Sequence, residues 1–84
     1  MTDKEHRPLQ HIAADIFATW GPKGQGVYFG AKPYLEAMLH LGSISEPYGA
    51  DSGSSIVRYF LANANTFRGP DARALKAELR AMLP

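Results

Sequence analysis

The chain contains no cysteine. Disulfide bonds and thiolate metal sites are therefore excluded, and packing must stabilise the fold. It also lacks the run of roughly 20 apolar residues that a membrane-spanning helix needs, and its first eight residues are mostly polar or charged where a signal peptide would be apolar. We therefore predict a cytoplasmic protein without a membrane segment.

The chain also has almost no net charge, because its nine Lys and Arg residues are nearly balanced by eight Asp and Glu residues, which leaves a formal charge of +1. So small an excess does not by itself indicate nucleic acid or a membrane as partner. The chain does have material for a core, since 45% of its 84 residues are hydrophobic, which argues against disorder. We expect a flexible tail over residues 1–7 and a single domain over residues 8–84.

Proline and glycine divide the remaining sequence into apolar-periodic segments. Proline tolerates the first position of a helix, and glycine favours the left-handed conformation just past a helix end. The punctuating residues are Pro8 with Gly21-Pro22, Pro33 with Gly42, and Gly69 before Pro70. This pattern predicts an all-α fold, a compact single domain of four short helices with two glycine-rich loops.

The apolar spacing within these segments predicts helices over residues 8–20, 33–41, 52–66 and 70–83. Asp51 or Ser52 is the natural N-cap of the third helix. We expect that helix to be central, with the first and fourth packed across it, and an extended piece is a further option at 27–29. The predicted core is Ile16, Trp20, Leu39, Ile56, Phe60, Leu61, Leu75 and Leu79, and Phe67 is expected to join it.

The residues whose side chains could act in catalysis or bind a metal form no catalytic or metal-binding pattern. The glycine-rich run 21–26 contains Lys23 but lacks the strand before it and the helix directly after it that a phosphate-binding loop needs. Glu36 and His40 supply two of the three or four ligands of a metal site. The serines of 52–55 suit helix capping. We predict no enzyme, no metal and no cofactor, and an enzyme using Glu36 and His40 is the third-ranked alternative.

Two sets of residues suit a protein partner. Tyr28, Phe29 and Tyr48 lie in the two long loops; if exposed, they form an aromatic surface. For Phe29 and Tyr48 we instead favour recruitment into the core, because so short a chain must bury much of its apolar area. A stripe of small residues on the last helix allows close approach of a second copy, and hence a homo-oligomer: Ala74, Ala77 and Ala81.

The leading hypothesis is therefore a non-catalytic module that recognises a protein partner. The alternative is nucleic-acid binding, because basic residues recur along one face of the last helix and in the segment before it, where five face only two carboxylates. The basic residues are Arg58, Arg68, Arg73, Lys76 and Arg80. An ordinary solvated face is the simpler interpretation of this small excess.

The C-terminal half also carries a resemblance. The runs that carry it are Tyr48 to Ser52, Ser55 to Leu61, Asn63-Ala64, Phe67 to Gly69 and Ala72-Arg73. Together they resemble small uncharacterised α-helical proteins of actinobacteria and their phages. The resemblance implies no catalytic residue and no cofactor. It implies a phage-related protein that binds a macromolecule of the host or the phage.

Overall fold

The computed structural model describes residues 7–20 and 26–83. Helices dominate these two ranges, as the sequence predicted for an all-α domain, and a pair of two-residue strands accompanies them. The helices are α1 (Leu9–Trp20), α2 (Lys32–Met38), α3 (Gly53–Ala62) and α4 (Pro70–Met82), and the strands are β1 (Pro47–Tyr48) and β2 (Asp51–Ser52).

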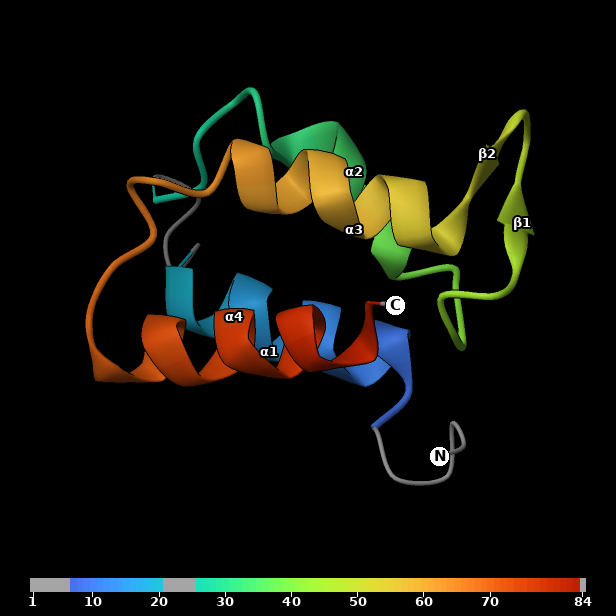
Figure 1. The fold of residues 1–84 in the computed structure, drawn as a ribbon. Helices are drawn as coiled ribbons and strands as arrows, with labels where there is room; N and C mark the ends of the chain where they lie inside the picture. The colour runs from blue at the N-terminus through green and yellow to red at the C-terminus, as the bar shows by residue number, and fades with distance from the viewer. Residues whose placement is uncertain (1–6, 21–25, 84) are drawn as a thin grey trace.

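The four helices form two layers, with α1 and α4 in one and α2 and α3 in the other (Figure 1). In addition, α1 packs against α2. The first and fourth helices face α3 across the core, as expected, but the nearest neighbour of α3 is α2. An apolar stripe identifies the buried face of a helix, but any other apolar stripe can cover it, so periodicity does not select the pairs.

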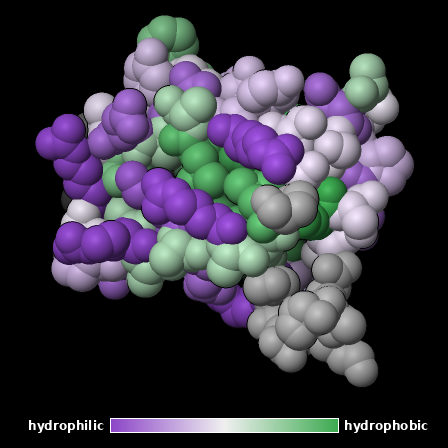
Figure 2. Space-filling model, in the orientation of Figure 1, coloured by the Kyte–Doolittle hydropathy of each residue, from purple (hydrophilic) through white to green (hydrophobic). Residues whose placement is uncertain are grey.

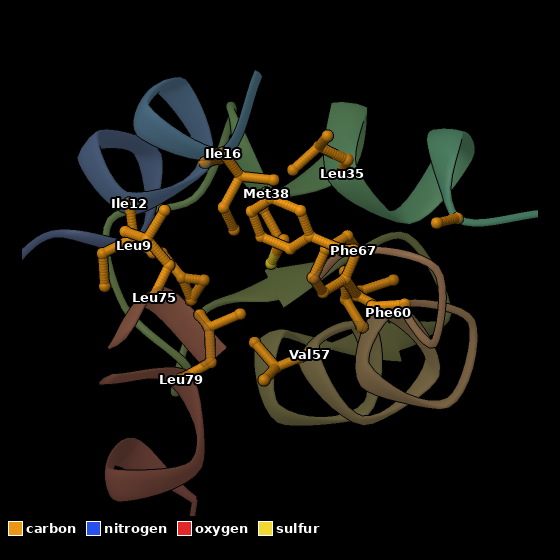
Figure 3. Packing of buried hydrophobic residues seen from close by; sticks show 14 of the residues in the cluster. Leu9, Ile12, Ile16, Leu35, Met38, Val57, Phe60, Phe67, Leu75 and Leu79 are labelled. Atoms are coloured by element: carbon orange, nitrogen blue, oxygen red, sulfur yellow. The ribbon is translucent and has the colours of Figure 1, made fainter. Parts of the chain in front are cut away.

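The core lies between the layers, where side chains of all four helices converge (Figure 3). The Trp20 ring meets the Phe60 ring edge to face at 6.1 Å and stacks on the Phe67 ring at 4.8 Å. Most of the predicted core is confirmed, although Leu61 is only partly buried. In Figure 2, apolar surface shows between the layers and hydrophilic side chains flank it.

Leu39 was predicted to be in the core, but it lies at the surface with 38% of the residue exposed. After Met38 the backbone bonds join residues three apart, from His40 to Ala37 and from Leu41 to Met38. In such a 3₁₀-type turn, residues i and i+3 point the same way. Leu41 therefore follows Met38 into the core, and Leu39 turns outward.

The third helix is shorter than predicted, because it ends at Ala62 with Asn63 as C-cap. Residues 63–69 then cross from one layer to the other (Figure 1), and from this connection Phe67 and Ala64 reach the core. Gly69 has a φ of 109° and precedes Pro70 at the start of α4. Gly69 is thus the N-cap of α4, and residues other than glycine rarely adopt its positive φ.

The start of α3 follows the prediction, but the loop before it contains a hairpin that was not predicted. Ser52 is the N-cap, and its hydroxyl accepts the Ser55 N–H at 3.2 Å. Strands β1 and β2 pair antiparallel around Gly49, whose φ is 62°. The extended piece considered at 27–29 is instead a turn, in which the Tyr28 carbonyl accepts the Ala31 N–H.

Gly53 is the first residue of α3 and touches the backbone of the preceding loop. A Cβ on Gly53 would lie 2.8 Å from the Ser43 carbonyl oxygen and 2.8 Å from the Ile44 Cα. We expect Gly53→Ala to lower the free energy of unfolding by about 1–3 kcal/mol, because the loop backbone must move. Urea unfolding followed by circular dichroism measures it. Arg58→Ala on the exposed side of α3 is the control, and an equal effect there would contradict the packing argument.

Candidate functional site

Two of the loop aromatics form an exposed pair. The rings of Tyr28 and Phe29 lie 4.9 Å apart, and 79% of Phe29 is exposed. Tyr48 is also exposed, at 41%. The favoured expectation that Phe29 and Tyr48 join the core was therefore wrong. In the core, the Trp20 ring contacts the rings of Phe60 and Phe67 instead.

A second aromatic pair lies on α2 and α3. The rings of Tyr34 and Tyr59 lie 5.4 Å apart, and the Asn63 side chain donates a hydrogen bond of 2.9 Å to the Tyr59 carbonyl. Asn63 and Tyr28 line the same hollow and meet at Gly30, where an added Cβ would lie 2.6 Å from the Tyr28 ring. We call Tyr28, Phe29, Tyr34 and Tyr59 the aromatic strip.

The structure separates Tyr48 from this strip. Tyr48 belongs to the hairpin at the N-terminal end of α3, whereas the segment that carries Tyr28 lies near the other end of that helix (Figure 1). The three loop aromatics of the sequence analysis therefore do not form one surface.

Sequence reasoning missed two members of the strip. Tyr34 lies on the predicted second helix and is only partly buried. Tyr59 is 45% exposed, and its position outside the apolar stripe of α3 was a signal that could have identified it. The pairing of these two rings depends on how α2 and α3 pack, which the sequence does not specify.

Three of the predicted basic residues surround one hollow at the junction of the 63–69 connection and α4. Its volume is about 290 Å³, and its walls are Phe67, Arg68, Gly69, Arg73 and Lys76. Arg80 lies close enough to Lys76 to affect its titration. Arg58 is exposed on α3 and is not part of this wall.

Lys76 also has a structural contact. Its ammonium donates a hydrogen bond of 2.9 Å to the Ala64 carbonyl, just past the end of α3, and lies 5.8 Å from the centre of the Phe67 ring. Burial lowers the pKa of Lys76, and the neighbouring charges of Arg80 and Arg68 lower it further. Lys76 therefore links the connection to α4 in a locally cationic environment.

The opposite flank of α4 is acidic and faces α1. Asp71 and Glu78 line a hollow there together with Asp15 of α1 and Arg7. Arg7 makes two bonds of 2.9 Å to the Glu78 carboxylate and one of 2.7 Å to Asp15. These bonds, Glu78 first, raise the pKa of Arg7 above its ordinary value. The helix thus separates its charges into one flank of each sign.

The alanines of α4 lie between these two flanks, on the side away from the core. Each is exposed to solvent: Ala74, Ala77 and Ala81. Self-association through this stripe stays a prediction.

The other candidates for chemistry have ordinary local roles or lie outside the described ranges. The Ser52 hydroxyl caps α3 and also contacts the hydroxyls of Ser54 and Ser55. Glu36 and His40 are exposed. In residues 7–20 and 26–83 no three His, Asp or Glu side chains gather as metal ligands would. Most of the glycine-rich run 21–26, including Lys23, lies outside the described residues.

No helix in the part of the chain that the structure describes is long and apolar enough to cross a membrane. Comparison of the chain with models of protein families, with curated proteins and with solved structures gives no match. The resemblance to small proteins of actinobacteria and their phages therefore stays a prediction. Function must be argued from the two surfaces themselves, the aromatic strip and the basic hollow.

Proposed function

We propose that this chain is a non-catalytic binding module that recognises a protein partner through the aromatic strip. The observation that carries the proposal is the presence of two contacting aromatic pairs at the surface, with most of Phe29 exposed to solvent. A small domain that leaves such area in water forgoes stabilisation of about 25 cal/mol for each Å². Burial against a partner would recover it.

The residue types in the strip also suit a protein interface. Tyrosine offers an apolar ring face and a hydroxyl that can bond to a partner, and it loses little side-chain entropy on binding. The Tyr59 ring of α3 contacts the Tyr34 ring of α2, so the two helices support each other's tyrosine at the surface. We also propose that the module works in the cytoplasm, because a chain without cysteine suits a reducing compartment.

The test compares capture of proteins from host lysate by three immobilised forms of the chain. We expect the wild type and Tyr48→Ser to retain the same protein, and the double variant Phe29→Ser/Tyr59→Ser to lose it, because interface aromatics contribute about 2 kcal/mol or more each. The retained protein is then purified and its affinity for all three forms measured by calorimetry.

Tyr48→Ser is the matched control, since it removes an equally exposed tyrosine outside the strip. Circular dichroism checks that the variants fold. Sedimentation of the chain with and without the retained protein shows whether that protein competes with self-association of the chain. Equal affinity of the wild type and the double variant for the purified protein would refute the strip as the binding surface. So would a loss of affinity in Tyr48→Ser as large as in the double variant.

A further inference from the structure

We infer that the hollow lined by Arg68, Arg73 and Lys76 receives a phosphate group of a single-stranded nucleic acid. This activity is additional to the proposed recognition of a protein by the aromatic strip, and the two surfaces share Tyr28. Four features support this ligand: the charge of the hollow, two basic side chains held in place, the length of the basic face and a second hollow beside it.

The first observation is an uncompensated concentration of positive charge. Arg68 comes from the connection, and Arg73 and Lys76 come from the first two turns of α4. In residues 7–20 and 26–83 no carboxylate lies at ion-pair distance from them, whereas Arg7 has two such partners. Like charges at short range repel one another. An anion in the hollow would turn this repulsion into attraction.

Two of the three basic side chains around the hollow, Arg68 and Lys76, are already held in place. The Arg68 Nε donates to the Asn65 carbonyl at 3.1 Å, which leaves the two terminal nitrogens for a ligand. Lys76 uses one N–H on the Ala64 carbonyl and keeps two. The hollow measures about 290 Å³ and opens to solvent. It therefore has room for a phosphate group, and donors held in this way lose little entropy on binding.

The basic face extends beyond the hollow. Arg80 continues it one turn past Lys76 and is exposed. From Arg73 to Arg80 the helix rises by about 10 Å, at 1.5 Å per residue. A single phosphate ion cannot contact both ends of such a face. The spacing favours a polymer with repeated phosphates.

A second hollow favours a single strand over a duplex. It measures about 350 Å³ and is lined by Tyr28, Ala62, Asn63, Asn65 and Thr66. Asn65 connects the two hollows, because it lines this one while its carbonyl accepts the bond from Arg68. Amide and hydroxyl groups beside an aromatic ring suit the edge and face of a base, and these are accessible when the base is unpaired.

The experiment measures fluorescence anisotropy of labelled oligonucleotides of about ten nucleotides, a length within the usual footprint of single-strand-binding domains. Single-stranded DNA and RNA and a duplex of equal length are titrated over a range of salt concentrations. We expect the single strands to bind more tightly than the duplex. The log–log slope of affinity against salt should be about −2 to −3, because each phosphate contact to a single strand contributes about −0.7.

The variant that tests the hollow is Arg68→Gln/Arg73→Gln, which leaves the structural contact of Lys76 in place. We expect about ten-fold weaker binding and a slope less steep by about 1.4, since two phosphate contacts are lost. Arg58→Glu is the control, because it changes the formal charge by the same two units outside the hollow. Its affinity should stay within about three-fold of the wild type.

A further variant, Asn65→Ala, separates the two hollows. It should weaken binding of the single strand without changing the salt slope, since it removes no phosphate contact. Absence of binding at low salt would overturn the inference, as would equal losses in Arg58→Glu and the double variant. A higher affinity for the duplex than for the single strands would also overturn the inference. So would displacement of the single strand by a phosphopeptide or by inorganic phosphate with the higher affinity, because the hollow would then belong to a different ligand.

Discussion

Phe60→Ala is expected to lower the free energy of unfolding by about 3–5 kcal/mol, a large part of what a domain of this size possesses. The Phe60 side chain is fully buried between the layers and meets the Trp20 ring at 6.1 Å. Truncation leaves a cavity where α3 faces the core, and helices fixed in two layers collapse only partly into it. Urea unfolding followed by far-UV circular dichroism gives the value.

The neighbouring residue supplies the control for Phe60. Tyr59 is of similar size but 45% exposed, and its loss removes one ring contact with Tyr34. We expect Tyr59→Ala to cost less than about 1.5 kcal/mol. If Phe60→Ala unfolded at nearly the same urea concentration as the wild type, the assignment of this face of α3 to the core would be wrong.

Phe67→Ala should have an effect of similar size, about 3–5 kcal/mol, although Phe67 lies outside any helix. Its ring is buried, stacks on Trp20 at 4.8 Å and lies beneath the ammonium of Lys76. The side chain therefore holds the 63–69 connection against the core. Loss of the stack alone, in Phe67→Leu, should cost less, because most of the apolar volume remains. Thermal and urea unfolding of both variants measure the difference.

Phe29→Ala is the matched control for Phe67, since it truncates the same residue type in another connection. With 79% of Phe29 exposed, its removal should change the free energy of unfolding by less than about 0.5 kcal/mol. Similar losses in Phe29→Ala and Phe67→Ala would show that the connection does not depend on the buried ring.

The helices themselves were predictable, because their signals are local. Pro70 at the first position of α4, the Ser52 cap and the 3.6-residue apolar spacing act within one or two turns of chain. The burial of Leu41 in place of Leu39 was not predictable in the same way. It follows from a change to bonds between residues three apart after Met38, and both residues are leucine, so hydrophobicity does not distinguish them.

The candidate sites were predictable only in part. The sequence identified Tyr28 and Phe29 as loop aromatics and the arginines of α4 as a basic face. It did not show that Tyr48 lies at the other end of α3 from Tyr28 (Figure 1), nor that Lys76 binds the Ala64 carbonyl across 12 positions of the chain. Contacts of this kind join segments that no short-range pattern relates.

The sequence by itself determined where helices begin, which face of each is apolar and which residue types are available for binding, because backbone preference and periodicity are properties of neighbouring residues. Only the tertiary structure decided that α1 pairs with α4 and α2 with α3. It also decided that the ring of Phe67 stacks on Trp20, that Phe29 lies in solvent, and that Arg68 joins Arg73 and Lys76 around one hollow. The physical reason is that several apolar faces of similar size compete for one core, and their relative positions, set by the connections, determine which residues it excludes.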